Sequence, residues 1–457
     1  MLLSLEFENS YSFRGTQDLN LARTPREARM SEARWPDCTW NHAYSPVAAI
    51  FGANAAGKSA LFRTLLAATK SPIRGAFAED LGVRQHAMAS SEPTRFSLRF
   101  AGPSIEDVES TVDTQSTEYH LAFEVDARGV VLREELRFYP REGQRSRRIY
   151  KRTVNLEEAD STPAKESQQS LYRYQWGDVL RGDKQVAARI TAPTDLFLLN
   201  AWLLEDDSLQ RVVSWFDDGI RFYGAADYRR GLPGIKRRLL SEPILQDKVA
   251  QFIRQADLGI TGLRVVPRSE EEVDSYRRAL DLSANGPWDF SVAVSDFAIA
   301  LSFTHSSEDG SFELAEQQES DGTLAMLSFA AIAIDALERG SVIVIDELDT
   351  SLHPLLVREL IRQFTSPETN PRQAQLIFTT HDLTLLHSAS WLDPLLARDQ
   401  IWLVEKSAAG TSELYSIAEF PVRNDENIFR KYLAGQYGSV PRAKFALVPL
   451  GAQAEAS

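Results

Sequence analysis

The chain is poor in cysteine and lacks any long apolar run. Its 457 residues hold a single cysteine, Cys38, which excludes an internal disulfide and a cysteine-rich zinc site and fits a reducing compartment. No apolar stretch approaches the roughly 20 residues that a membrane helix needs. The start, Met1 to Phe13, also lacks the basic and apolar regions of a signal peptide. We therefore expect a cytoplasmic protein without a membrane span.

An excess of positive charge is also missing. Lys and Arg number 50 against 64 Asp and Glu, and the formal net charge of −14 argues against a protein that coats nucleic acid. Two local basic clusters remain, and each is interpreted first as a solvated surface and second as a nucleic-acid contact. The clusters are Arg141, Arg145, Arg147, Arg148, Lys151 and Arg152, and then Arg229, Arg230, Lys236, Arg237 and Arg238.

Both ends of the chain show an α/β rhythm. With 43% hydrophobic residues, we expect one principal domain that carries a sizeable insertion. Near the start we predict strands at 3–7 and 46–51, a helix at 58–69, and alternating strands at 95–100, 119–125 and 130–138. In the last third we predict helices at 323–338 and 355–364 and strands at 342–345, 376–380, 401–405 and 413–417. This alternation predicts a mostly parallel sheet that is flanked by helices and binds ligands at the carboxyl ends of its strands.

The middle of the chain is different. Residues 141–169 are polar and are typical of a mobile excursion or a domain boundary. The stretches 196–223 and 244–256 look helical, and no heptad is sustained long enough to predict a coiled coil. We therefore divide the chain into residues 1–140, a mainly helical insertion at 141–287 with a polar flexible start, and residues 288–457.

The stretch from Gly52 to Ser59, GANAAGKS, matches the phosphate-loop pattern G-x-x-x-x-G-K-[ST]. It follows an apolar strand and opens a helix, which is the context that the mechanism requires. Gly and Ala let backbone N–H groups close around phosphates, and the helix amino terminus adds the positive end of its dipole. In such a loop we expect Lys58 to reach the β and γ phosphates of ATP and Ser59 to be a ligand of Mg²⁺.

Two further strands end in polar residues that belong at the same edge of the sheet. Asp346 and Glu347 follow the apolar strand 342–345, so Asp346 faces the metal and the phosphates and Glu347 is the candidate base for water. His381 follows the strand at 376–380. Two acids after a strand, or a lone histidine, also occur in purely structural roles, but their pairing with a phosphate loop favours a site.

In this order, these elements resemble the head of an ABC-type ATPase, in which such a histidine contacts the γ phosphate. The resemblance implies a signature turn, which Glu319 to Thr323 would supply, and a loop joining two sites, with Asp349 as its key acid. In ABC heads this turn completes the site of a partner subunit, so a head-to-tail dimer is implied. An ordinary helix cap at Ser320 or Asp321 is the alternative. The implied fold is an α/β P-loop head with an antiparallel β subdomain and the helical insertion.

Within these heads, the chain is similar to the prokaryotic AAA/ABC ATPases of abortive-infection and related phage-defence systems, which are akin to overcoming-lysogenization ATPases. The similarity covers the first sixty residues and nearly everything after Asp257, whereas Arg141 to Pro193 matches no named family. The stretches that carry it are Leu5 to Asn9 with Phe13, Ala256 to Ile260, Glu319 to Thr323, Asp346 to Pro354, Phe378 to Asp382 and Tyr432 to Gly438.

The expected site has catalytic, nucleotide-binding and metal-binding parts. The catalytic residues are Glu347, His381 and Lys58, and the ligands of Mg²⁺ are Ser59 and Asp346. The residues expected to bind ATP are Gly52, Ala53, Asn54, Ala55, Ala56, Gly57, Lys58, Ser59, Ala60, Ser320, Asp321, Gly322 and Asp349.

Three positions depart from the family pattern. Ala55 stands where glycine is frequent, and we expect it to fit with ordinary backbone torsions. Asp321 replaces the first glycine of the transporter signature, and a carboxylate near a γ phosphate is repulsive unless a metal or an arginine offsets it. The glutamine that usually links magnesium to the insertion has only Gln85 as a candidate.

The resemblance predicts a Mg²⁺-dependent, dimerising ATPase that acts as a sensor or scaffold in antiviral defence. The stretch after His381 is too short for an appended nuclease domain, so we expect the effector, a nuclease or toxin, on another chain. The alternative is an SMC-like DNA repair or recombination ATPase that clamps nucleic acid through the local basic clusters. A transporter ATPase needs a membrane partner, and a small-molecule kinase would leave the signature turn without a role.

Overall fold

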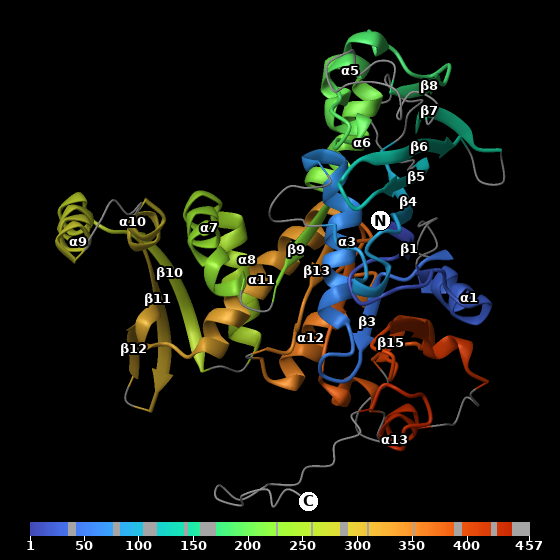
Figure 1. The fold of residues 1–457 in the computed structure, drawn as a ribbon. Helices are drawn as coiled ribbons and strands as arrows, with labels where there is room; N and C mark the ends of the chain where they lie inside the picture. The colour runs from blue at the N-terminus through green and yellow to red at the C-terminus, as the bar shows by residue number, and fades with distance from the viewer. Residues whose placement is uncertain are drawn as a thin grey trace, which may run out of the picture.

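The chain folds around two large β-sheets that share one hydrophobic core, with a smaller sheet set apart (Figure 1). The computed structural model describes residues 1–34, 43–75, 83–103, 117–140, 145–155, 171–224, 227–256, 259–283, 291–308, 310–350, 352–387, 395–421 and 427–440. Cys38, Arg141 and the side chain of Arg229 lie outside the described residues. Within the described part, no helix has the length and apolar character needed to cross a bilayer.

The first sheet has six strands in the order β16, β15, β3, β14, β13 and β9. Four of its five pairings are parallel, and β15 pairs antiparallel with β16. Parallel strands are covered on both faces and therefore read as continuous apolar runs, such as VAAIF in β3 and VIVI in β13. The strands are β3 (Val47–Phe51), β9 (Ile220–Tyr223), β13 (Val342–Ile345), β14 (Gln375–Thr379), β15 (Ile401–Lys406) and β16 (Ser412–Ser416).

Helices cover both faces of this parallel sheet. Alternate residues of a strand point to opposite faces, so Ala48 and Ile50 of β3 pack with α3 (Lys58–Arg74) and α6 (Asp207–Asp217). Val47 and Ala49 pack on the other face, with α11 (Asp321–Arg339) and α12 (Pro354–Thr365). The helix that follows the phosphate loop and the helix that follows the signature turn therefore lie on opposite faces of the sheet.

The second sheet is antiparallel throughout and has seven strands in the order β2, β1, β4, β5, β6, β7 and β8. Its inward side chains alternate with outward polar ones, as the pattern of β5 shows. Trp215 of α6 stacks on Phe100 of β4, which ties this sheet to the parallel one. The strands are β1 (Leu2–Glu8), β2 (Gln17–Asn20), β4 (Thr94–Gly102), β5 (Thr117–Val125), β6 (Val131–Tyr139), β7 (Arg147–Val154) and β8 (Tyr172–Trp176).

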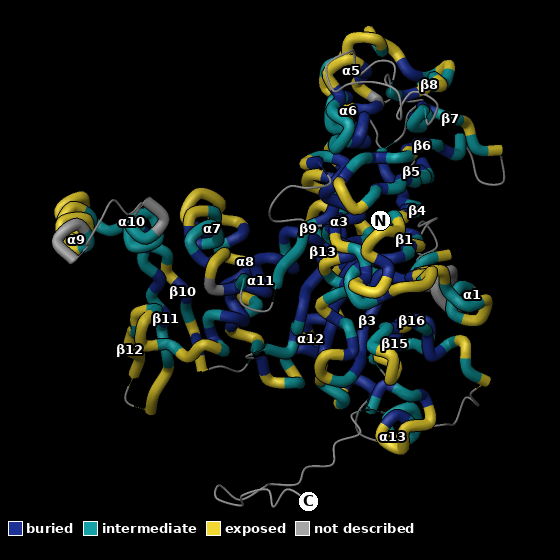
Figure 2. The backbone as a smooth tube through the Cα atoms, in the orientation of Figure 1, coloured by how far each residue is buried: buried dark blue, intermediate teal, exposed yellow. Residues whose placement is uncertain are grey.

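A third, three-stranded sheet joins several helices beside α11. It comprises β10 (Ile260–Pro267), β11 (Ile299–Ser307) and β12 (Gly310–Ala315), with helices α7 (Asp227–Ser241), α8 (Pro243–Gln255), α9 (Glu270–Ser283) and α10 (Ser291–Phe297). Residues of α7, α8, β10 and β11 share a core with Leu327, Ala330 and Ala331 of α11. Figure 2 shows that α9 and β12 are largely exposed, whereas the parallel strands are buried.

The remaining segments are short. They are α1 (Pro25–Arg34), α5 (Lys184–Ile190), α13 (Ile428–Leu433) and the 3-10 turns Ala87–Ala89, Phe197–Leu204, Glu316–Gln318, Leu383–Leu386, Arg398–Gln400 and Ile417–Glu419. In Figure 1, α13 lies next to the β15–β16 hairpin, near the end of the described chain.

The middle of the chain differs from the expectation. The boundary drawn at residue 141 does not separate two parts of the fold, because β7 and β8 continue the seven-stranded sheet. A polar strand with one solvated face has the composition of a linker, which explains the difference; residues 156–170 lie outside the described part. The stretch 196–223 ends in β9, a strand of the parallel sheet, rather than in a helix. Four residues are too few to show a strand period.

Candidate functional site

The phosphate loop connects β3 to α3 and lies at the carboxyl end of the parallel sheet. The amino terminus of α3 has no side-chain cap and no acid in its first turn, so its free N–H groups face the loop. Lys58 Nζ donates hydrogen bonds to the carbonyl oxygens of Gly52, at 2.9 Å, and Ala53, at 3.2 Å. The ammonium group therefore sits across the loop, where phosphate oxygens would replace the carbonyls.

Both glycines of the loop are needed for close packing. A Cβ atom at Gly52 would lie 2.5 Å from the carbonyl oxygen of Val404, and one at Gly57 would lie 2.5 Å from Ser412 Oγ. Gly57 also has a φ of 125°, which L side chains rarely adopt. Ala55 contradicts the expectation of ordinary torsions, since its φ of 61° is left-handed. This conformation costs an alanine about 1–2 kcal/mol, so the loop is strained at Ala55.

The two acids follow β13 as predicted, and a threonine of the neighbouring strand holds both. Thr379 Oγ1 donates to Asp346 Oδ1 at 2.6 Å and accepts from the Glu347 backbone N–H at 2.8 Å. Glu347 has a left-handed φ of 55°, and such strain in a residue other than glycine is concentrated at functional sites. Thr379 was not among the site residues expected from the sequence. The only signal was a hydroxyl residue at the carboxyl end of a predicted strand.

His381 and Asp349 are joined directly. The His381 backbone N–H donates to both carboxylate oxygens of Asp349, at 3.3 Å each. The imidazole of His381 is exposed, and Asp349 is half-buried. The loop after β14 and the loop after β13 are therefore linked at one edge of the sheet, which leaves the histidine side chain accessible to a ligand.

Three carboxylates act electrostatically on Lys58. Burial lowers the pKa of Lys58, and the carboxylates of Glu347, Asp346 and Asp349 oppose this shift. Three acids around one lysine would repel a triphosphate unless a cation is bound with it. The Ser59 hydroxyl and the Asp346 carboxylate are oxygen donors of the kind that Mg²⁺ prefers. The donor set at this edge therefore fits a magnesium nucleotide.

No cluster of three or more His, Cys, Asp or Glu in the described part of the chain is arranged to hold a metal by itself. Mg²⁺ is usually held by one or two protein ligands and completed by substrate phosphates and water.

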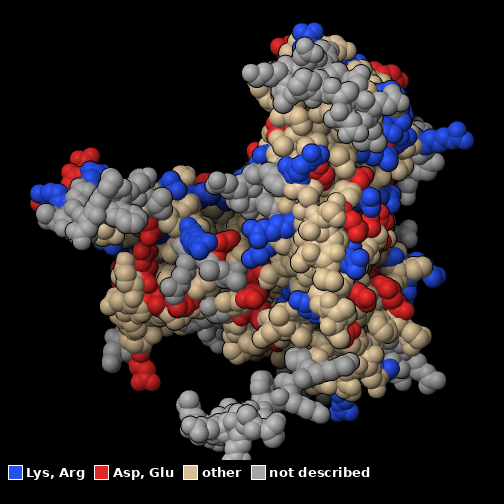
Figure 3. Space-filling view, in the orientation of Figure 1, with Lys and Arg blue, Asp and Glu red and all other residues tan. Residues whose placement is uncertain are grey.

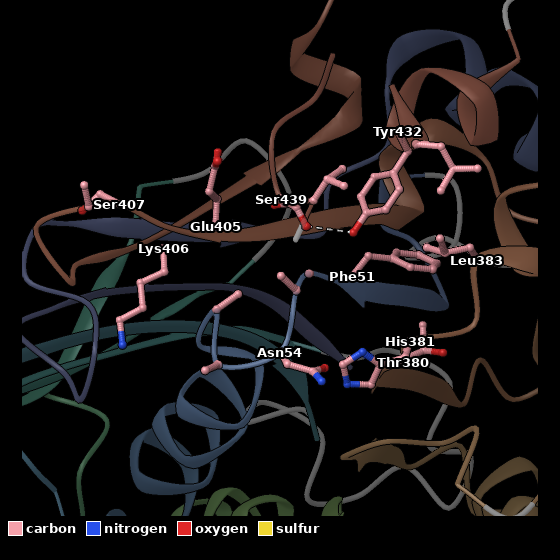
Figure 4. A pocket seen from close by; sticks show the side chains of 17 residues that line it. Phe51, Asn54, Thr380, His381, Leu383, Glu405, Lys406, Ser407, Tyr432 and Ser439 are labelled. Atoms are coloured by element: carbon pink, nitrogen blue, oxygen red, sulfur yellow. Dashed lines mark hydrogen bonds between the residues drawn. The ribbon is translucent and has the colours of Figure 1, made fainter. Parts of the chain in front are cut away.

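A pocket of about 810 Å³ opens beside the loop, and Figure 4 shows the side chains that line it. Its size is within the range of small-molecule sites. Five predicted loop residues, Gly52 to Ala56, and His381 line it. The sequence did not indicate the opposite wall, which consists of Glu405, Lys406, Ser407 and Ala408 after β15 and Tyr432, Leu433, Ser439 and Val440 near the end of the described chain.

The other predicted residues do not line this pocket. Ser59 is exposed in the first turn of α3, and Ala60 lies within the helix, where its carbonyl accepts from Thr64 Oγ1. Gln85 Nε2 donates to the Asp126 carbonyl at 3.3 Å in the turn after β5. Its side chain is therefore directed to the antiparallel sheet.

The predicted signature turn begins α11. Ser320 Oγ accepts from the Thr323 backbone N–H at 3.1 Å, which is the ordinary cap. Ser320 and Asp321 are exposed, and Gly322 is half-buried. His305 Nε2 and Glu319 Oε1, 2.5 Å apart, anchor the turn to β11. Because α11 and α3 cover opposite faces of the sheet, this turn is not brought to the phosphate loop of its own chain.

Each basic cluster contains a member that is not on the surface. Arg152 is fully buried, with its Nε 3.6 Å from Glu134 Oε2. Lys236 is also buried and pairs with Asp296 at 2.5 Å and Glu316 at 3.1 Å. A charge inside the core must be paired, so Arg152 and Lys236 form buried ion pairs and do not contribute to a basic surface. Each stretch of basic residues therefore contains both a core pair and surface charges.

Comparison with known proteins agrees with this geometry. Residues 47–387 match the model of a protein family described as "AAA domain, putative AbiEii toxin, Type IV TA system". The chain belongs to this family. The match confirms the resemblance to ATPases of the abortive-infection group, and the AAA domain spans the phosphate loop, both acids and His381.

No curated protein is matched to this AAA domain protein by sequence. One solved structure, titled "Crystal structure of the SmcHead bound to the C-winged helix domain of ScpA", aligns at 13% identity with a TM-score of 0.44 and covers 91% of this chain and 97% of that one. A second, the Smc head domain with an extended coiled coil bound to the C-terminal domain of ScpA from Pyrococcus furiosus, aligns at 12% identity with a TM-score of 0.39. It covers 91% of this chain and 96% of that one. Likeness at these scores supports no statement about function.

Proposed function

We propose that this AAA domain protein binds ATP with Mg²⁺ and hydrolyses it. The observation that carries the proposal is the convergence of two loops at the carboxyl end of one parallel sheet: Lys58 follows β3, and Asp346, Glu347 and Asp349 follow β13. Ser59 and Asp346 would hold Mg²⁺, which supplies positive charge to the phosphate oxygens. Lys58 would exchange its two carbonyl partners for the β and γ phosphates.

In this proposal Glu347 is the base. It follows β13 directly, its backbone N–H is fixed by Thr379, and the hydrogen bond that its carboxylate accepts from Thr350 Oγ1 is a long one, at 3.4 Å. It is therefore available to orient a water molecule and accept its proton. His381, held through its backbone by Asp349, would contact the γ phosphate, and loss of that phosphate would release the contact.

We further propose that two copies pair head to tail and complete each other's sites. Ser320 and Asp321 are exposed at the start of α11, on the face of the sheet opposite α3. This position suits contact with a second copy. Ser320 and Gly322 of the partner subunit would close over the ATP held by Lys58, because the positive end of a helix dipole attracts anions. Asp321 adds a carboxylate there, so we expect slow turnover.

A complementation experiment tests this arrangement. Lys58→Ala removes the phosphate-loop lysine and Ser320→Arg blocks the turn, so each variant alone should be inactive as an ATPase. A mixed dimer keeps one intact site, made of Lys58 from one chain and Ser320 from the other. An equal mixture should recover about a quarter of the wild-type rate, since half of the dimers are mixed and each has one site. No recovery from well-folded variants would contradict the shared site.

For the biological role, we propose a sensor or scaffold in antiviral defence whose nucleotide state controls an effector on another chain, a nuclease or toxin. The family description, which names a toxin of a toxin–antitoxin system, supports this context. Co-expression with its genomic neighbours should give an effector that copurifies with the Glu347→Gln variant in ATP and is released in ADP. Equal retention in both nucleotides would contradict control by nucleotide state.

The alternative, an SMC-like ATPase that clamps nucleic acid, is favoured by one face of the antiparallel sheet. Arg99, His120, Arg137 and Arg148 are register partners in a row across β4 to β7. Arg137, Arg133 and Arg148 share a single acid, Glu135. Figure 3 shows Lys and Arg side chains gathered over this part of the molecule.

Charge reversal distinguishes the two candidates. If nucleic acid binds this face, Arg137→Glu with Arg148→Glu should weaken DNA binding and reduce its salt dependence. Arg95→Glu is the matched control, because Arg95 lies on the same sheet and pairs with two acids, Glu8 and Glu124. Absence of salt-dependent DNA binding by the wild-type protein would remove this alternative.

A further inference from the structure

The β15–β16 hairpin packs directly against the phosphate loop. At one end of the loop, the carbonyl oxygen of Val404 lies so close to Gly52 that no side chain fits there. At the other end, Ser412 Oγ donates to the Ala56 carbonyl oxygen at 2.6 Å and lies 2.8 Å from Ser12 Oγ. Ser412 is completely buried, so this contact belongs to the interior and does not touch a ligand.

The Ser412 hydrogen bond sets the direction of one peptide group in the loop. The peptide between Ala56 and Gly57 is planar and trans, so its C=O and N–H point in opposite directions. With the carbonyl held outward by Ser412, the Gly57 N–H must point into the loop. There it can donate to a phosphate oxygen, as loop N–H groups do at the start of a helix.

The hairpin is in turn held by a turn at residues 435–439 whose backbone is left-handed at three positions. Gly435, Gly438 and Ser439 have φ values of 73°, 70° and 58°, all left-handed. Tyr415 Oη, on β16, donates to the Tyr437 carbonyl at 2.7 Å. Burial raises the pKa of Tyr415 to about 12, so the hydroxyl keeps its proton.

Gly438 also packs directly against this hairpin. A Cβ atom at Gly438 would collide with Glu405 Oε2 and lie 2.8 Å from Tyr415 Oη. Glu405 and Ser439 line the same pocket as the phosphate loop. The turn, the hairpin and the loop are thus in continuous contact.

We propose that Ser412 is a positioning residue of the phosphate loop and that the turn at 435–439 keeps its hairpin in place. The end of the described chain then influences nucleotide affinity through the hairpin that contacts the loop. This inference rests on the proposed function, because it assumes that the loop binds nucleotide. It gives a role to the Tyr432 to Gly438 stretch, which otherwise only carries the resemblance to the family.

The test compares two buried serines of the same strand. Ser412→Ala frees the Ala56–Gly57 peptide, so the Kd values of ATP and ADP should both rise about tenfold, or about 1.4 kcal/mol. The kcat should stay close to the wild-type value, since the loop holds ground state and transition state alike. Ser416→Ala is the control. Its hydroxyl contacts Ile401 O and Ala418 N within the hairpin region and not the loop, so nucleotide affinity should not change.

Tyr415→Phe tests the second step, since it removes the bond to Tyr437 and should raise both Kd values by a smaller factor than Ser412→Ala. Wild-type affinity in Ser412→Ala would overturn the inference alone and leave the proposed function standing. An equal loss of affinity in Ser412→Ala and Ser416→Ala would also overturn it, because that result indicates general destabilisation. Failure of the wild-type chain to bind either nucleotide would overturn both proposals.

Discussion

The two large sheets use their charged residues in opposite ways. At the carboxyl end of the parallel sheet, Lys58 and Asp346 are bonded to carbonyls and to a threonine hydroxyl, which a ligand can replace or share. On the buried face of the antiparallel sheet, charges neutralise one another: Glu134 and Arg152 form a fully buried pair. Glu134 is also held by the Tyr150 hydroxyl and the Phe197 backbone N–H. The first arrangement is suited to binding a charged ligand, and the second to holding a scaffold.

The largest expected effect is a loss of stability from a substitution in the antiparallel sheet, with the candidate nucleotide site left unchanged. Arg152→Met leaves Glu134 buried and unpaired, which should lower the free energy of unfolding by about 3–5 kcal/mol. Nucleotide affinity, measured below the unfolding transition, should stay unchanged. Arg128→Met is the control, because Arg128 is 82% exposed in its pair with Asp126 and should contribute less than about 1 kcal/mol. A loss of affinity in folded Arg152→Met would show that the two sheets are not separate in function.

The next largest effect is a loss of ATP hydrolysis from a substitution in the candidate site, with the stability of the fold left unchanged. Glu347→Gln should slow ATP hydrolysis by about 10²-fold, as removal of a general base commonly does, while ATP binding and the unfolding temperature are kept. Single-turnover kinetics with an equilibrium binding assay would measure both. Glu368→Gln, on the exposed surface, should behave like the wild type. Undiminished hydrolysis by Glu347→Gln would exclude Glu347 as the base.

A third prediction concerns how the stability contributed by Glu135 in the antiparallel sheet depends on pH. Burial alone would raise the pKa of Glu135, but hydrogen bonds from Arg137, Arg133 and Arg148 lower it to about 2. A carboxyl whose folded pKa lies below its unfolded value stabilises the fold above the unfolded pKa, near 4.5, and loses this contribution as the pH falls. The difference in unfolding free energy between wild type and Glu135→Gln should be constant at neutral pH and shrink below about pH 4.5. A difference that does not vary with pH would contradict the shift.

The smallest expected effect is a difference in stability between two glycine substitutions in the phosphate loop, one at the left-handed Ala55 and one at its neighbour Ala56. Ala55→Gly relieves a left-handed alanine, so it should leave stability equal or raise it by up to about 1 kcal/mol. Ala56→Gly, at a buried neighbour without such a torsion, should lower stability by about the same amount. Urea unfolding of both variants measures the pair. A loss of stability in Ala55→Gly together with a gain in Ala56→Gly would contradict the assignment of backbone strain to Ala55.

The sequence predicted where those residues of the candidate site lie that belong to a single motif. The loop from Gly52 to Ser59, the acids after 342–345 and His381 could be placed because each follows a short apolar run, and parallel strands end at a common edge. Contacts between distant segments had no such signal. Ser412 bonds to Ala56 across 356 positions, and Thr379 reaches Asp346 from another strand. β9 and the junction at residue 141 were misjudged because short or half-solvated strands resemble their surroundings in composition.

The most direct test of the central claim is calorimetric titration of MgATP into the wild-type protein and into Lys58→Ala. Lys248→Ala, whose lysine pairs with Glu338 at the surface, serves as the control. The wild type and Lys248→Ala should bind one nucleotide per chain with the same affinity, whereas folded Lys58→Ala should show no measurable binding. Equal affinity in all three proteins would contradict the claim that separate loops of the parallel sheet converge on a triphosphate.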